Sequence, residues 1–131
     1  MHRARRRRPA LTVTTEEFSG LVRQALDGLP RDYARIMKNV AVMVEEEPPH
    51  DVLDELGLES EDDLLGLYSG PGADDETFFD PGGQLPARIA IYRGPILRLC
   101  RTAAEVVREV RDTVIHEIGH YFGLGDDEMP Y

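Results

Sequence analysis

Near its C-terminal end the chain reads Val114-Ile115-His116-Glu117-Ile118-Gly119-His120-Tyr121-Phe122-Gly123-Leu124-Gly125-Asp126. On a helix, His116 and His120 are four residues apart, so both imidazoles project from one face about one turn apart. Two nitrogen ligands in this arrangement suit a single metal ion. Glu117 lies beside them as a general base that need not bind the metal.

The residues that follow the histidine pair extend the metal-binding pattern. Gly123 can adopt positive φ and end the helix. The chain can then turn back and offer Asp126, or its neighbour Asp127, as a third ligand. The alternative is a solvated helix with two ordinary histidines and an acidic end, and the fixed offsets of Gly and Asp make that coincidence much rarer.

The helix that carries the histidines is expected to begin at a capping box, in which Thr102 and Glu105 satisfy free backbone N–H groups, and to run to about Gly123. A buried stripe at helical spacing is formed by Val107, Val110, Val114, Ile118 and Tyr121. His116 and His120 project roughly opposite this stripe and therefore face a groove and not the core. Asp112 and Thr113 share their side and are candidate partners for the imidazole N–H groups.

The motif His116-Glu117-x-x-His120-x-x-Gly123-x-x-Asp126 resembles the extended signature of zincin metallopeptidases, in the form with Asp as third ligand. Together with 91–95, 111–114 and the short chain, it resembles the small bacterial zincin-like metallopeptidase family over roughly residues 12 to 131. The resemblance implies a zincin fold and a zinc ion. In zincins, an exposed edge strand near the metal helix binds the substrate antiparallel through backbone hydrogen bonds.

Length and charge predict one domain, at residues 12–131, behind a flexible basic tail at residues 1–11. Residues 1–10 hold five arginines and no acid, whereas the rest of the chain has 10 basic and 25 acidic residues, a charge of −15. Such a body repels nucleic acid and anionic membranes, and only the arginine tail offers either of them a weak contact.

Compartment is predicted from what the sequence does not contain. No stretch approaches the roughly 18 apolar residues of a membrane-spanning helix, and no apolar segment follows the basic start as in a secretory signal. Cys100 stands alone and is expected to be a small buried apolar residue. A lone cysteine without a disulfide fits a reducing, cytoplasmic compartment.

The rest of the chain predicts an α+β fold, in which a small mixed or antiparallel sheet packs on an N-terminal helix and on the metal helix. Thr14 and Glu17 form a capping box before an amphipathic helix that ends near Pro30. The β-branched run 39–44 is expected to be a strand covered on both faces. A short helix follows within 51–63, 64–68 is either a strand or a helix end, and 69–86 is a loop. Residues 88–93 are predicted to be a strand ended by Gly94-Pro95 and are the candidate substrate-binding edge.

The expected function is hydrolysis of peptide bonds by a zinc metallopeptidase, with His116, His120 and Asp126 as zinc ligands and Glu117 as general base. Tyr131, Tyr121 and Arg93 are candidate donors to the oxyanion, and Tyr131 is also a candidate floor beneath the metal. Only five residues follow Asp126, so the cleft is expected to have one wall unless a homodimer or partner supplies the other. Two alternatives remain open: a non-catalytic zinc-binding regulatory module, and a zinc-free domain held by a partner.

Overall fold

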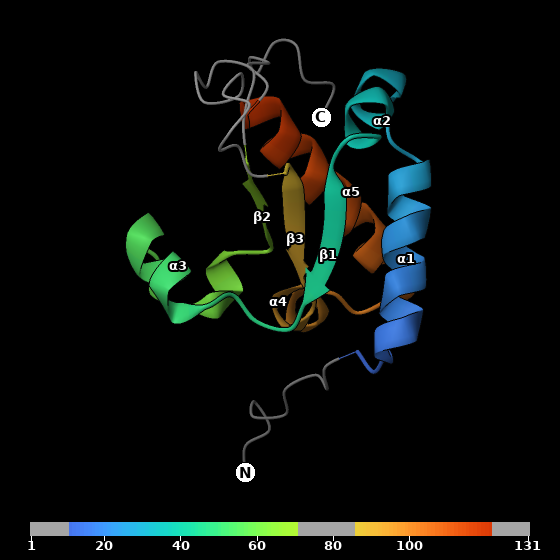
Figure 1. Ribbon diagram of the computed structural model, residues 1–131. Helices are drawn as coiled ribbons and strands as arrows, with labels where there is room; N and C mark the ends of the chain where they lie inside the picture. Colours follow the sequence, from blue (N-terminus) through green and yellow to red (C-terminus); the bar gives the residue numbers. More distant parts are fainter. Residues whose placement is uncertain (1–10, 71–85, 122–131) are drawn as a thin grey trace.

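The computed structural model describes residues 11–70 and 86–121, with the side chain of Tyr121 left out. These residues form a mixed α+β fold, as the sequence predicts (Figure 1). In chain order the elements are α1 (Thr15–Asp27), α2 (Arg31–Met37), β1 (Ala41–Glu45), α3 (His50–Leu56), the short 3-10 helix η2 (Glu61–Asp63), β2 (Gly66–Ser69), β3 (Arg88–Tyr92), α4 (Arg93–Leu99) and α5 (Ala103–Tyr121).

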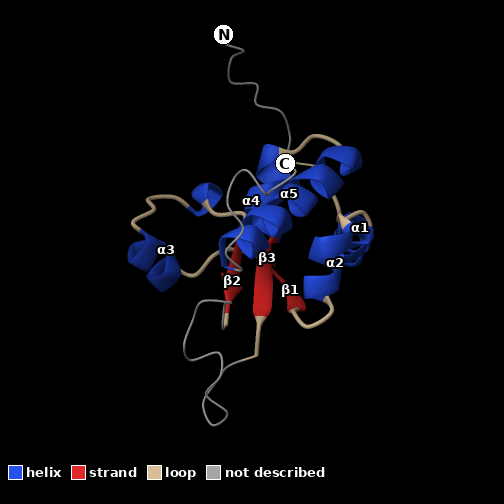
Figure 2. Ribbon diagram, turned by 90° about the horizontal axis from the view of Figure 1, so that it is seen from above, coloured by secondary structure: helices blue, strands red, loops and turns tan. Residues whose placement is uncertain are grey.

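The sheet is mixed and has the order β1-β3-β2. β1 pairs with β3 in parallel, from Ala41 opposite Arg88 to Glu45 opposite Tyr92. β2 pairs with the other side of β3 in the antiparallel sense, from Gly66 opposite Ile91 to Ser69 opposite Arg88. Figure 2 shows α1 and α5 together on one face of this sheet, where α1 packs on α5 and α5 packs on β2.

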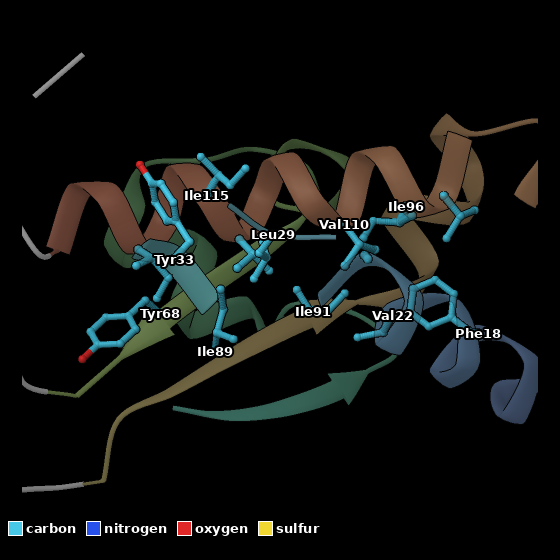
Figure 3. Packing of buried hydrophobic residues seen from close by; sticks show 14 of the residues in the cluster. Phe18, Val22, Leu29, Tyr33, Tyr68, Ile89, Ile91, Ile96, Val110 and Ile115 are labelled. Carbon is cyan, nitrogen blue, oxygen red and sulfur yellow. The ribbon is translucent and has the colours of Figure 1, made fainter. Parts of the chain in front are cut away.

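The core lies between the helices and that face of the sheet (Figure 3). α1 contributes Phe18 and Val22, and β3 contributes Ile89 and Ile91. α5 contributes side chains that are fully buried along most of its length: Val106, Val110, Val114, Ile115 and Ile118. Each such side chain stabilises the fold by about 1.5–3 kcal/mol relative to an exposed position, so α5 is held firmly. Cys100 is buried among these residues, as predicted.

Two predictions about the strands are wrong. β1 lies at an edge of the described sheet, and its residues alternate between exposed and half-buried, so it is not covered on both faces. Residues 88–92 form the central strand and not the exposed edge. The β-branched composition of both segments indicates strands correctly, but their order depends on long-range pairing that neither segment encodes. The ambiguous segment after η2 is the strand β2.

The helix boundaries follow local chemistry. The capping box of α1 is present, with Glu17 N–H donating to Thr14 Oγ1 at 3.0 Å and Thr14 N–H donating to Glu17 Oε1 at 2.9 Å. At α5 one half of the predicted capping box is present, because Thr102 Oγ1 accepts from Glu105 N–H. The other half is shifted, because the Glu105 carboxylate accepts from the N–H of Arg101, one residue before the predicted cap. The short helices α2 and α4 were not predicted. Gly94-Pro95 ends β3 but also lies in the first turn of α4, where proline's missing N–H costs nothing.

Several predictions fall outside the described residues. They concern the arginine tail, most of the loop predicted at 69–86, and the segment that holds Gly123, Asp126, Asp127 and Tyr131. Within the described ranges, no helix is both long and apolar enough to cross a membrane.

Candidate metal centre

α5 carries His116, Glu117 and His120 in its last two turns. Both histidines are exposed, whereas Ile115 and Ile118 are fully buried. The apolar stripe therefore faces the core and the imidazoles face away from it, which is the arrangement that the helical spacing predicts. Glu117 lies between the two histidines in the sequence, and its side chain is half-buried.

A hydrogen bond orients the first imidazole. His116 Nδ1 lies 3.0 Å from the backbone carbonyl oxygen of Asp112, one turn earlier on the helix. Because a carbonyl only accepts, Nδ1 carries the proton and Nε2 keeps its lone pair for a metal. The sequence pointed to Asp112 as a partner, and the structure uses its backbone while its carboxylate lies 3.5 Å from Arg111 Nε.

Glu117 is held from the opposite side by the sheet. The backbone N–H of Tyr68 in β2 donates to Glu117 Oε1 at 2.9 Å. Burial raises the pKa of the Glu117 carboxyl above its usual range, while the Tyr68 N–H and the nearby His120 and His116 oppose this rise. A carboxylate with a raised pKa next to a histidine pair is better suited to accept a proton than an exposed one.

A pocket of about 340 Å³ opens beside these groups, between the start of β2 and α5. His116 and Glu117 line it, as do Gly66 of the strand and Thr113 of the helix. Among the described residues that line the pocket there is no lysine or arginine. Four of them carry carboxylates: Asp63, Glu109, Asp112 and Glu117. The described lining therefore favours cations over anions.

The described residues hold part of a metal-ligand set. Across residues 11–70 and 86–121, no three His, Cys, Asp or Glu side chains converge closely enough to hold a metal ion. The predicted third ligand, Asp126, and its reserve, Asp127, lie outside these ranges. The two histidines nevertheless fit zinc, because the pair is exposed at helical i, i+4 spacing and His116 has Nε2 available.

The strand next to Glu117 is β2, which replaces the predicted candidate at 88–93. Tyr92 N–H donates to the carbonyl oxygen of Leu65, so these two residues are a hydrogen-bonded pair of β3 and β2. Along an antiparallel pair such positions alternate with positions that make no hydrogen bonds to the neighbouring strand. The N–H and C=O groups of Gly66 and Tyr68 therefore point away from β3. Sequence reasoning missed both residues, although a glycine inside a strand signals a close backbone approach.

The candidate oxyanion donors remain predictions. Arg93 lies at the start of α4, where its guanidinium pairs with Glu46 at 2.9 Å and also donates to the backbone carbonyl oxygen of Val13. Neither contact joins it to the histidine pair. The side chain of Tyr121 and all of Tyr131 lie outside the described part of the chain.

Comparison with known proteins supplies the family. No curated protein matches the chain. Among solved structures, it resembles a conserved hypothetical protein from T. thermophilus, with 28% identity and a TM-score of 0.51 over 82% of this chain and 92% of that one. A family model for zincin-like metallopeptidases matches residues 37–131, which include β1 to β3, α5 and the whole His-Glu-x-x-His motif. The chain therefore belongs to the zincin-like metallopeptidase family.

Proposed function

We propose that this protein is a zinc-dependent peptidase that hydrolyses peptide bonds with Glu117 as general base. One observation carries the proposal: a half-buried carboxylate with a raised pKa lines a pocket together with His116, lies near His120 and is anchored by a backbone amide. A purely structural zinc site needs no such base and is usually closed by a fourth protein ligand. The non-catalytic module is therefore the second choice.

His116, His120 and Asp126 would hold the zinc. When bound, zinc would supply Lewis-acid activation of a water molecule and of the scissile carbonyl group. Oε1 of Glu117 accepts from Tyr68 N–H. The other carboxylate oxygen, Oε2, would take the proton of the attacking water and then pass it to the leaving amine.

The outer edge of β2 is the proposed docking line for the peptide. Its outward backbone groups at Gly66 lie at the pocket that Glu117 also lines. A peptide that adds to this edge gains main-chain hydrogen bonds that are independent of sequence. The scissile bond would then pass over the histidine face of α5.

The test is cleavage of a mixed peptide library, read by mass spectrometry as new peptide ends. Wild-type protein is expected to cleave, and Glu117→Gln to leave the library intact. Glu55→Gln, an exposed carboxylate on α3, is the matched control and should cleave like wild type. Equal cleavage by wild type and Glu117→Gln would indicate a contaminating protease and refute the assignment. A zinc-loaded wild type that cleaves nothing would favour the non-catalytic module.

A further inference from the structure

β2 approaches α5 more closely at Gly66 than a side chain would allow. A Cβ atom built on Gly66 would lie 2.7 Å from Thr113 Cγ2 and 3.0 Å from the carbonyl oxygen of Ala90. The φ angle of Gly66 is not positive, so this position needs glycine for its small size and not for its backbone freedom. The contact between Gly66 and Thr113 therefore sets the distance between strand and helix.

The same interface holds Glu117 one step further along. Thr113 and Glu117 are four residues apart on α5, a rise of about 6 Å, and Gly66 and Tyr68 are two residues apart on β2, a rise of about 6.7 Å. The close contact and the hydrogen bond from Tyr68 N–H to Glu117 Oε1 are thus successive contacts between one strand and one helix. A change in spacing at the first contact is transmitted to the second.

We propose that Gly66 and Thr113 are positioning residues, which set the spacing between β2 and α5 and thereby hold the Tyr68 amide against the Glu117 carboxylate. The inference rests on the proposed function only in taking Glu117 as the base. It assigns a role to two residues outside the His-Glu-x-x-His motif, whose side-chain positions do not touch the reacting groups, although the backbone of Gly66 lies on the proposed docking edge.

The size of the effect follows from the distances. Carbon atoms in contact are normally about 3.5–4.0 Å apart, so a methyl group on Gly66 requires a shift of about 1 Å. Thr113 has few ways to relieve this, because a branched Cβ leaves it only two common χ1 rotamers on a helix, and the Ala90 oxygen belongs to the central strand. Adding about 1 Å to the 2.9 Å bond at Glu117 takes it past the usual limit of about 3.2 Å.

The experiment uses the full-length, zinc-loaded protein and two readouts. The first is hydrogen-exchange protection of the Tyr68 amide by NMR, which does not depend on catalysis. The second is kcat and KM on a peptide cleaved by wild type. In Gly66→Ala, protection of the Tyr68 amide should fall at least tenfold. kcat should fall roughly 10- to 100-fold, the scale of a 1 Å misplacement, with zinc content unchanged. KM should rise as well, because the backbone of Gly66 lies on the proposed docking edge.

Rescue separates positioning from general damage. The double variant Gly66→Ala/Thr113→Ser removes the Cγ2 atom that the new methyl group meets, so most of the lost protection and kcat should return. The 3.0 Å approach to the Ala90 oxygen remains and should keep the recovery short of wild type. Gly20→Ala on α1 is the matched control, since a Cβ there meets nothing within 4 Å, and it should leave both readouts unchanged. If Gly66→Ala cannot be purified, Thr113→Ile enlarges the same contact from the helix side and should give the same losses.

Normal Tyr68 protection and normal kcat in Gly66→Ala would overturn the inference, as would a double variant no better than the single one. Loss and rescue of Tyr68 protection, in a protein that cleaves no peptide even as wild type, would support the positioning role and count against the proposed function. The two failures are therefore distinguishable.

Discussion

Replacing Glu117 by Gln is the most informative single substitution in this chain. The carboxamide has nearly the same shape as the carboxylate. Its oxygen can still accept from Tyr68 N–H, which in the wild-type structure donates to the carboxylate at 2.9 Å. The substitution therefore removes the proton acceptor while leaving the contact between β2 and α5 in place.

The kinetic and structural effects should differ widely in size. Losing a general base costs about 10²- to 10⁴-fold in rate, or about 2.7–5.4 kcal/mol at 1.36 kcal/mol per factor of ten. Exchanging a charged acceptor for a neutral one weakens a hydrogen bond by about 1 kcal/mol. Removing a half-buried charge offsets that loss, because burial already disfavours the ionised carboxyl. The melting temperature should therefore stay within about 5 °C of wild type.

The assay measures kcat/KM on one cleaved peptide, together with zinc content and the melting temperature of the same preparation. Glu117→Gln should keep one zinc per chain and lose at least about 100-fold in kcat/KM. Retention of a tenth or more of wild-type activity would show that the proton goes elsewhere. Loss of zinc together with activity would show that Glu117 supports the metal site and not the chemistry.

Three further predictions concern the metal, the C-terminal segment and pH. His116→Ala and His120→Ala should each abolish stoichiometric zinc in metal analysis, and Asp126→Ala should do so unless its neighbouring aspartate is the third ligand, in which case affinity stays at the wild-type level. Deletion of residues 129–131 should weaken zinc affinity by about tenfold or more if Tyr131 supports the ligands, whereas unchanged affinity, stability and activity would show that it does not. In metal-free protein, burial raises the pKa of Glu117 and so penalises its ionised form; the free energy of unfolding should therefore fall as pH rises from the usual pKa of 4.5 through the raised folded pKa. Denaturant titrations from about pH 4 to 8 should show the stability of Glu117→Gln increasing relative to wild type over that interval. A stability difference that does not change with pH would contradict the direction of the pKa shift.

The helix that carries the site was predictable because its signals are local. The spacing of Val110, Val114 and Ile118 fixes one face in the core, and this places His116 and His120 on the other side without knowledge of the rest of the chain. The capping box at Thr14 is a similar short-range pattern, and the structure contains it.

The environment of the site was not predictable because it joins distant segments. Tyr68 and Glu117 are 49 residues apart, and no local sequence pattern at either residue predicts their hydrogen bond. The order of the strands has the same origin, since β2 and not the segment 88–92 is the strand that contacts Glu117. Gly66 was the one available signal. A glycine inside a short apolar strand marks a close approach, but sequence alone does not say what approaches.

Zinc titration of metal-free protein is the decisive experiment for a zinc-dependent peptidase. Peptide cleavage is followed as zinc is added in fractions of an equivalent to protein stripped of metal by a chelator. Activity should be absent at the start, rise in proportion to zinc and level off at one equivalent per chain. Full activity in the stripped protein, or no activity at saturating zinc, would contradict the assignment of a zinc-dependent peptidase.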